Sequence, residues 1–522
     1  MVCRLVAEVL RTSTVQASQP SIKRNLIATY VSQGWVALMG FAFAPLYIKF
    51  LGIEAYGLIG AFTVLYSLLV FFDFGISPTL MREVSRFTGG AYSATEVRDL
   101  IRTAEVIAVA IAATILLGLW FVSGWLAVHW FKADKLDPAT VANAVKAMGL
   151  VAALRFVESI YRGCITGLER LTLLGALNAT AATLRGLGAV AVLAFVSNTV
   201  GAFFLWQAVV SVLSLAVLVS ATYASLPGGD RPARPSIQAA RGVARFASGM
   251  ILITALSLGL TQVDKLLLMK LLPLSDFGRY SLAALVAVSL EMLAEPAFRA
   301  FGPRFSKLHA ADDEAGFTRL YHQAAQLVSI VAGSAAVVLI IFAKPFLSLW
   351  TQDPHLAEQT APLLQVLALG YLLNLCVWIP YLAQLAYRWT GLAIRVNAVA
   401  LCVIIPLLLW IVPRYGAIGA AWVWTGLNAT YFVVLVHFMH RRLLKYEKWQ
   451  WYAVDVFGPV ASATVAAAII RFSIPLGQLS TISQAAVLAL ASGAALTAST
   501  ATSPVYRAIL GAEISRLLRA KR

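Results

Sequence analysis

Apolar residues fill this 522-residue chain in long stretches that short polar segments interrupt. A helix needs about 20 apolar residues to cross the hydrocarbon core of a bilayer. By that criterion the sequence predicts about fourteen membrane-spanning helices. Their approximate limits are residues 25–48, 57–80, 104–128, 143–165, 172–196, 200–223, 246–269, 280–302, 321–342, 361–385, 391–411, 417–438, 453–472 and 482–500.

The composition indicates the same class of protein. Hydrophobic residues make up 60% of the chain, charged residues make up 12%, and the mean hydropathy is +0.80. Soluble globular proteins carry about 25% charged residues, so a soluble chain is excluded. We therefore predict an all-α polytopic membrane protein.

Two segments that lie 221 residues apart share a sequence pattern. The matching pairs are Lys49 and Lys270, Leu51 and Leu272, and Gly57 and Gly278. A second, weaker match joins residues 201–206 with residues 419–424. Each copy lies at the same end of an apolar hairpin, which is typical of internally duplicated transporters.

A stretch rich in Pro, Gly and Arg at residues 226–235 cannot form a helix interior, so residues 224–245 are predicted to be a cytoplasmic linker. It separates two six-helix lobes, residues 25–223 and 246–440. Because six is an even number, both lobes begin on the same side of the membrane and are predicted to be parallel repeats. Two further helices follow within residues 453–500.

Basic residues are concentrated in alternate connections, among them residues 81–103, 224–245 and 303–320. Lys and Arg in short loops are retained in the cytoplasm, so we predict a multi-pass protein with both termini cytoplasmic. The N-terminal tail is residues 1–24, and the basic tail 505–522 is either an interfacial helix or solvated. The formal net charge of +17 then reflects topology and attraction to anionic lipid, and nucleic-acid binding is not expected.

Charged residues inside the spans are candidates for function, because each costs about 2.5–3.5 kcal/mol at a helix centre. Arg155, Glu158 and Arg162 are spaced to share one face of the fourth span, and Arg185 interrupts the fifth. Guanidinium groups match phosphate oxygens in geometry and charge. We therefore predict that Arg155, Arg162 and Arg185 bind a phosphate or pyrophosphate.

Other charges are assigned to two further roles. The candidates for ion coupling or cavity charge are Asp264, Glu291, Glu295, Arg299 and Glu158. The candidates for a structural or gating role, near span ends, are Asp73, Lys265 and Arg395. An open alternative is that the i, i+4 pairs, Glu158 with Arg162 and Glu295 with Arg299, only hold helices together.

No motif indicates an enzyme. The chain has no phosphate-binding loop of the Gly-Lys-Ser/Thr type, and its six histidines are not spaced as metal ligands. The longest connections carry no evident catalytic constellation. We therefore expect no catalytic residue, no cofactor and no metal.

Several motifs resemble those of a known family. They are LGIEAYG at residues 51–57, DFGIS at 73–77 with Arg82, QVDK at 262–265, FGRYS at 277–281, PRFS at 303–306 and YGAIGAA at 415–421. Their order and spacing over residues 20–440 resemble bacterial polysaccharide biosynthesis proteins, the O-antigen-type oligosaccharide flippases. These belong to the multidrug/oligosaccharidyl-lipid/polysaccharide exporter superfamily.

The resemblance implies a V-shaped, two-lobed protein similar to the multidrug transporters of that superfamily. It also implies a flippase that moves undecaprenyl-pyrophosphate-linked repeat units across the inner membrane by alternating access, for exopolysaccharide, capsule or O-antigen synthesis. H⁺ or Na⁺ would be the coupling ion, membrane lipids would be bound, and a polysaccharide polymerase and a chain-length regulator would be partners. Residues 453–500 would bind the lipid tail, as in related lipid II flippases.

Three alternatives remain open at this point. A lipid II flippase would share the arginines and the fourteen spans. A drug/cation antiporter would favour an acidic or aromatic pocket, whereas Arg155, Arg162 and Arg185 make this half of the chain cationic. A polytopic polysaccharide polymerase would need catalytic residues in a sizeable outer loop, and every predicted outer loop is short.

Overall fold

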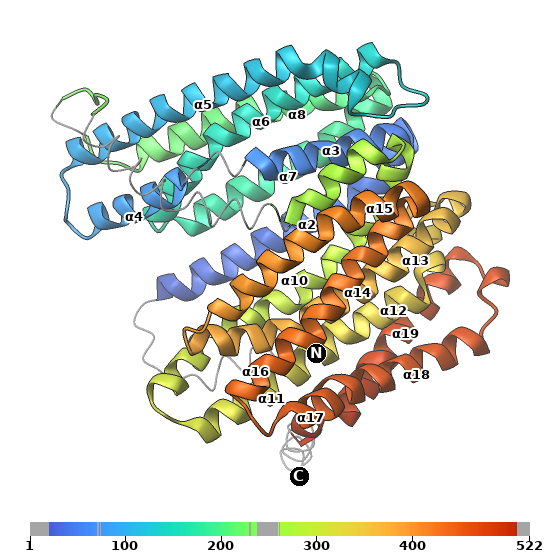
Figure 1. Cartoon of the computed structure of the whole chain (residues 1–522). Coiled ribbons are helices and arrows are strands. Elements are labelled where there is room, and N and C mark those ends of the chain that lie inside the picture. The colour runs from blue at the N-terminus through green and yellow to red at the C-terminus, as the bar shows by residue number, and fades with distance from the viewer. Residues whose placement is uncertain are drawn as a thin grey trace, which may run out of the picture. The chain divides into compact units, whose positions relative to one another are not determined.

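The computed structural model describes residues 20–69, 73, 75–228, 231–236, 259 and 261–508. Within these residues the chain forms helices joined by short connections and contains no β-strand (Figure 1). Lys132 and Pro273 form an isolated parallel bridge. The all-helical class predicted from the apolar segments is confirmed.

The first half of the chain contains seven helices among the described residues. They are α2 (Pro20–Leu51), α3 (Ile53–Leu69), α4 (Ile76–Thr88), α5 (Ala94–His129), α6 (Pro138–Gly167), α7 (Leu171–Phe195) and α8 (Val200–Ala224).

The second half continues after a helix over residues 261–271. Its larger elements are α10 (Leu274–Ala310), α11 (Glu314–Val328), α12 (Ser334–Ile341), α13 (Ala343–Thr351), α14 (Pro354–Ala386), α15 (Gly391–Thr430), α16 (Val436–Arg442), α18 (Gly458–Ser473) and α19 (Thr481–Thr502). Shorter elements join them, namely η2 (Ser329–Gly333), η3 (Tyr431–Leu435), α17 (Lys448–Gln450), η4 (Trp451–Phe457) and η5 (Leu476–Gln478).

Eleven helices among the described residues are long and apolar enough to cross a membrane. The sequence predicts about fourteen spans, and the two numbers differ because of three segments. Two predicted spans, 391–411 and 417–438, fall in one helical stretch, Gly391–Arg442, which breaks between them at Gly416, where the backbone is not helical. α3 is apolar but shorter than the other spans, and most of residues 246–269 lie outside the described part of the chain. The multi-span class is confirmed, whereas the exact number of helices stays a prediction.

The chain packs as two compact units. The first takes its described residues from Met1–Phe43, Leu69–Phe121 and Val145–Ile251, and the second takes them from Ala44–Leu68, Val122–Ala144 and Leu252–Arg522. The predicted lobe limits stay a prediction. The tails 1–19 and 509–522, and most of the linker 224–245, lie outside the described residues.

The core of the first unit joins α4, α5, α6 and α8. Leu80, Ile101 and Ile160 are completely buried in it. Glu105 of α5 is also buried and accepts hydrogen bonds from Tyr161 of α6 (2.8 Å) and Tyr223 of α8 (2.7 Å). A carboxylate inside an apolar core is tolerated only with such partners, so this group fixes the three helices against one another.

The last two long helices, α18 and α19, lie side by side in the second unit (Figure 1). Their contact is made by small side chains, since Ala463, Ala467, Ala491 and Ala495 are completely buried. Small residues let helix backbones approach closely where no hydrophobic effect drives association within a membrane.

Candidate functional site

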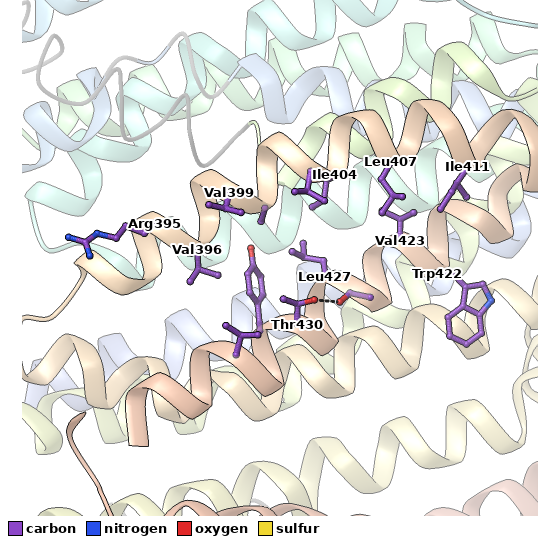
Figure 2. A pocket seen from close by; sticks show the side chains of 15 residues that line it. Arg395, Val396, Val399, Ile404, Leu407, Ile411, Trp422, Val423, Leu427 and Thr430 are labelled. Carbon is purple, nitrogen blue, oxygen red and sulfur yellow. Dashed lines mark hydrogen bonds between the residues drawn. The ribbon is translucent and has the colours of Figure 1, made fainter. Parts of the chain in front are cut away.

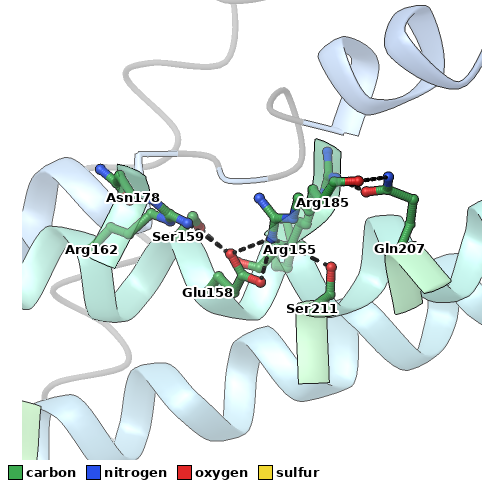
Figure 3. A network of polar contacts seen from close by, with 9 residues as sticks. Arg155, Glu158, Ser159, Arg162, Asn178, Arg185, Gln207 and Ser211 are labelled. Atoms are coloured by element: carbon green, nitrogen blue, oxygen red, sulfur yellow. Dashed lines mark hydrogen bonds and ion pairs between the residues drawn. The ribbon is translucent and has the colours of Figure 1, made fainter. Parts of the chain in front are cut away.

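The charged residues predicted on the fourth and fifth spans form one network in the first unit (Figure 3). Glu158 of α6 is 1% exposed. It accepts hydrogen bonds from Arg162 one turn later (2.9 Å) and from Arg185 of α7 (3.1 Å). The carboxylate therefore joins two helices and neutralises only part of the positive charge around it.

Neutral side chains complete this network. Arg155 donates to the Oε1 atom of Gln207 on α8 (3.1 Å), and Gln207 in turn donates to the backbone carbonyl of Arg185 (3.4 Å). Arg162 also donates to Asn178 of α7. The helices α6, α7 and α8 thus bring Arg155, Arg162 and Arg185 into a single site.

Asp73 reaches the edge of the same network. Its carboxylate accepts from the hydroxyl of Ser77 (2.8 Å) at the first turn of α4, and Ser77 also contacts Ser159 of α6 (3.1 Å). Even with Asp73 counted beside Glu158, arginines outnumber carboxylates. The site is cationic and partly buried, which is the electrostatic environment that a phosphate group requires.

The repeated segments meet directly in the second unit, where α3 crosses α10. A Cβ atom added to Gly57 would lie 2.4 Å from the carbonyl oxygen of Leu274, and one added to Gly278 would lie 2.3 Å from that of Ile53. Leu274 follows Ile53 by the same 221 residues that separate the two glycines. The contact is therefore reciprocal, as expected across a local two-fold axis between repeat copies.

A cavity of about 270 Å³ adjoins this crossing. Its lining includes the following pairs at that repeat offset: Tyr56 and Phe277, Ile59 and Tyr280, Gly60 and Ser281, Thr63 and Ala284, Val64 and Leu285, and Ser67 and Val288. The pairs show that both copies of the repeat build the same cavity.

Lys265 is the charged residue that lines this cavity. Its ammonium group lies 3.3 Å from the carbonyl oxygen of Thr261. Asp264 and Glu291 lie close enough to interact electrostatically with Tyr371, which also lines the cavity. Of these three predicted residues, Lys265 lines the cavity itself, and Asp264 and Glu291 interact with one of its lining residues.

The other predicted residues, Glu295, Arg299 and Arg395, do not line this cavity. Glu295 and Arg299 form an i, i+4 ion pair on α10 with both side chains close to half exposed (44% and 46%). Arg395 lies near the start of α15 and lines an apolar groove. Among the described residues, no group of His, Cys, Asp and Glu could hold a metal ion.

Sequence reasoning missed a buried network in the second unit. His322 of α11 bonds to the completely buried Asp455 of η4 and to Glu447 (3.0 Å). Gln326 also donates to Asp455 (2.8 Å), and its carbonyl oxygen accepts from the backbone of Val505 (3.2 Å). A His and an Asp at the ends of two distant spans were the available signal, but their sequence separation of more than 100 residues hides the contact.

The fold and the cationic site define a class, namely a polytopic helical membrane protein with a repeated architecture and charges inside its spans. Comparison with known families gives the assignment. The chain belongs to the polysaccharide biosynthesis protein family, whose model matches residues 22–309. The model of the MatE family matches residues 249–411.

Individual proteins agree with this family. The protein named "Putative O-antigen transporter" from Shigella flexneri is 22% identical over 396 residues, covering 74% of this chain and 92% of that protein. Among solved structures, the lipid II flippase MurJ in an inward closed conformation superposes with a TM-score of 0.70 at 13% identity, covering 93% of this chain and all of MurJ. A multidrug resistance MATE family transporter of the MOP superfamily, inward-facing, gives 0.62 at 11% identity, covering 79% and 96%. These likenesses show the fold.

Proposed function

We propose that this chain is a flippase that moves undecaprenyl-pyrophosphate-linked oligosaccharide repeat units from the cytoplasmic to the periplasmic leaflet of the inner membrane. The observation that carries the proposal is the partly buried network of Arg155, Arg162 and Arg185 around one carboxylate, Glu158. Membership of the polysaccharide biosynthesis protein family and the MurJ-like fold support it.

The physical problem for such a protein is the charge of the substrate. Moving an uncompensated anion into a medium of low dielectric constant costs tens of kcal/mol by Born solvation. Guanidinium groups held by α6, α7 and α8 offset this cost, because each presents several donors in a fixed plane. Glu158 keeps Arg162 and Arg185 in place, and the excess of positive charge is left for the pyrophosphate.

Alternating access requires two arrangements of the same helices, and the repeat contact is the place where they separate. Gly57 and Gly278 hold α3 and α10 in close contact. The two glycines would move apart when the protein opens on that side. Lys265 lines the adjoining cavity, and Asp264 and Glu291 interact electrostatically with its lining residue Tyr371; we assign to these three residues the binding of the coupling ion, H⁺ or Na⁺.

After translocation the repeat units are joined into a polymer. A polysaccharide polymerase and a chain-length regulator are therefore the partners that this role requires. We place both termini in the cytoplasm on the basis of the basic connections. No step of the proposal makes or breaks a covalent bond, so the protein acts as a transporter and not as an enzyme.

The decisive experiment asks on which membrane face the repeat units accumulate when the gene is deleted. A membrane-impermeant sugar-binding reagent is applied to spheroplasts and to inverted vesicles. We expect labelling in inverted vesicles alone. Repeat units that reach the outer face unpolymerised would instead indicate a polymerase, and unchanged sugar intermediates with lowered tolerance of cationic drugs would indicate an antiporter.

Variants in the same assay test the cationic site. We expect Arg155→Ala and Arg185→Ala to abolish export while the protein still inserts into the membrane. Arg155→Lys should restore export only in part, because an ammonium replaces a planar fork. Arg414→Ala is the control, since this exposed arginine on α15 donates to the carbonyl oxygen of Trp410 and lies over its ring, outside the network. Wild-type export in both alanine variants would contradict the pyrophosphate role.

A second candidate is a lipid II flippase, favoured by the match to MurJ over 93% of this chain. Its substrate also carries a polyprenyl pyrophosphate, so the arginine network suits either. The two differ in the phenotype of the deletion. Loss of a lipid II flippase stops peptidoglycan synthesis, whereas loss of the proposed flippase stops a surface polysaccharide.

A further inference from the structure

An apolar groove runs between the two arms of α15. The helix folds back at Gly416, whose φ of 61° and ψ of −149° are not helical. Residues 391–411 and 417–430 therefore form two arms, and side chains from both, among them Leu407 and Val423, line the space between them (Figure 2). The cavity measures about 610 Å³, which lies within the usual range for ligand sites.

The groove has an apolar body and one charged end. Val396, Val399, Val403, Leu407 and Leu427 are among the residues of its walls. Arg395 lies at one end and Trp422 at the other (Figure 2).

The guanidinium group of Arg395 is available to bind an anionic group of a ligand. It makes no hydrogen bond or ion pair with the residues that the structure describes. Residues 237–258, the longest internal stretch not described, contain no Asp or Glu. A guanidinium at the end of a span is stabilised when an anionic group neutralises it.

The groove is long enough for a single hydrocarbon chain. The helical rise places Ile411 about 24 Å from Arg395 along the helix axis. This length approaches the roughly 30 Å thickness of the hydrocarbon core. A chain lying in the groove would therefore follow the membrane normal with its end at Arg395.

We propose that this groove binds the polyprenyl chain of the lipid-linked substrate in a first binding step, with the phosphate at Arg395 before Arg155, Arg162 and Arg185 bind it. The proposal rests on the proposed flippase function and adds a site for the tail. In a polyprenyl phosphate the anionic group is joined directly to one chain. In the groove, the charge of Arg395 likewise adjoins the apolar wall with no gap, because that wall begins at the next residue, Val396. A phospholipid has two chains and a glycerol spacer, and it matches this geometry less well.

The charged end of the groove also faces the side on which the substrate is made. Trp389, just before α15, stacks with Arg442 of α16, whose guanidinium carbon lies 4.5 Å from the ring centre. Arg441, at the end of the same helix, and Lys445, in the connection after it, add further positive charge. This basic connection is predicted to be cytoplasmic. A polyprenyl phosphate in the cytoplasmic leaflet would therefore meet Arg395 first.

This groove is a different place from residues 453–500, which the family resemblance predicted to bind the lipid tail. The contact between α18 and α19 is closed by the buried alanines Ala463, Ala467, Ala491 and Ala495. The groove in α15 is open along walls in which Val399 and Val403 are more than half exposed (64% and 55%).

The test is native mass spectrometry of the purified full-length protein, titrated with sugar-free undecaprenyl phosphate and separately with phosphatidylglycerol. Val403→Trp fills the groove and Arg395→Gln removes the charge. Their matched controls are Val465→Trp, an exposed valine of α18 outside the groove, and Arg414→Gln on the same helix. We expect both groove variants to weaken undecaprenyl phosphate binding by about tenfold, and both controls to bind as wild type.

Unchanged binding in either groove variant would overturn the proposal, because the chain and the phosphate must both engage. Equal or tighter binding of phosphatidylglycerol at the same residues would overturn it in favour of a structural phospholipid. The assay uses a lipid without sugar and involves no translocation. A negative result in this binding assay would therefore overturn the tail site alone. The flippase function is tested separately, by the accessibility of repeat units in the deletion strain.

Discussion

Glu158 is the residue on which the arginine network depends. Its carboxylate is 1% exposed and contacts Arg162 and Arg185. Glu295 forms the same i, i+4 pair with Arg299, but both side chains are close to half exposed. The two pairs have the same spacing in the sequence, and only their burial shows that the Glu158 pair contributes more to stability.

This difference gives a measurable prediction. Removing one partner of a buried ion pair costs about 3–5 kcal/mol, because the other charge is left uncompensated, whereas an exposed pair contributes about 0–1 kcal/mol. We expect Glu158→Gln to lower the thermal unfolding temperature in detergent clearly, and Glu295→Gln to leave it nearly unchanged. Equal effects of the two substitutions would show that Glu158 is not the anchor of the network.

Glu83, on the short helix α4, makes stability depend on pH. Partial burial raises the pKa of Glu83, but hydrogen bonds from Tyr92 and Arg82 and the charges of Arg82 and Arg86 outweigh it, so the pKa is below its ordinary value. A lowered folded-state pKa contributes stability above the unfolded pKa, and that stability is lost as the pH falls through the folded pKa.

We therefore expect Glu83→Gln to be less stable than wild type at neutral pH. The difference should shrink as the pH falls below the ordinary carboxyl pKa of about 4.3. Unfolding curves across that range check it. Glu358→Gln is the control, since Glu358 pairs with Lys344 while 68% exposed. A gap between Glu83→Gln and wild type that persists in acid would contradict the assignment to ionisation.

At the scale of elements, the crossing of α3 and α10 depends on two glycines. Any side chain on Gly57 or Gly278 would collide with backbone of the other helix, at 2.4 Å and 2.3 Å. We expect Gly57→Ala and Gly278→Ala each to destabilise the protein by about 1–3 kcal/mol, as overpacking does, and to impair export. Gly40→Ala is the control, because nothing lies within 4 Å of its added Cβ atom. Wild-type stability of both variants would mean that the helices do not cross this closely.

The sequence predicted the elements better than the contacts between them. The repeat of residues 46–57 at 267–278 predicted that each copy lies at the same end of an apolar hairpin, and α3 and α10 begin within these segments. That the copies touch reciprocally could not be predicted, because a repeat offset carries no information on distance. His322 and Asp455 show the same limit, since buried polar partners are chosen by packing between distant helices.

At the scale of the whole molecule, the distribution of basic residues predicts topology. Ala91 lies in a predicted cytoplasmic connection and Asn198 in a predicted outer one. Both positions are exposed, so a cysteine introduced at either can react with a reagent. In a background lacking the exposed Cys402 and also Cys3, we expect a membrane-impermeant maleimide added to spheroplasts to label Asn198→Cys and not Ala91→Cys. The opposite pattern would reverse the predicted orientation. Permeabilised cells, in which both cysteines must react, provide the control.

The sequence by itself determined the class of protein, the helical segments, their repeat and the identity of the charges within them. It could do so because a bilayer imposes a length and an apolar composition on each span locally. Tertiary structure decided which charges meet. Arg155, Arg162 and Arg185 share one site because α6, α7 and α8 pack together, whereas Arg395 lies at the end of an apolar groove because α15 folds back at Gly416. Such contacts depend on how helices rotate and cross, which no single segment encodes.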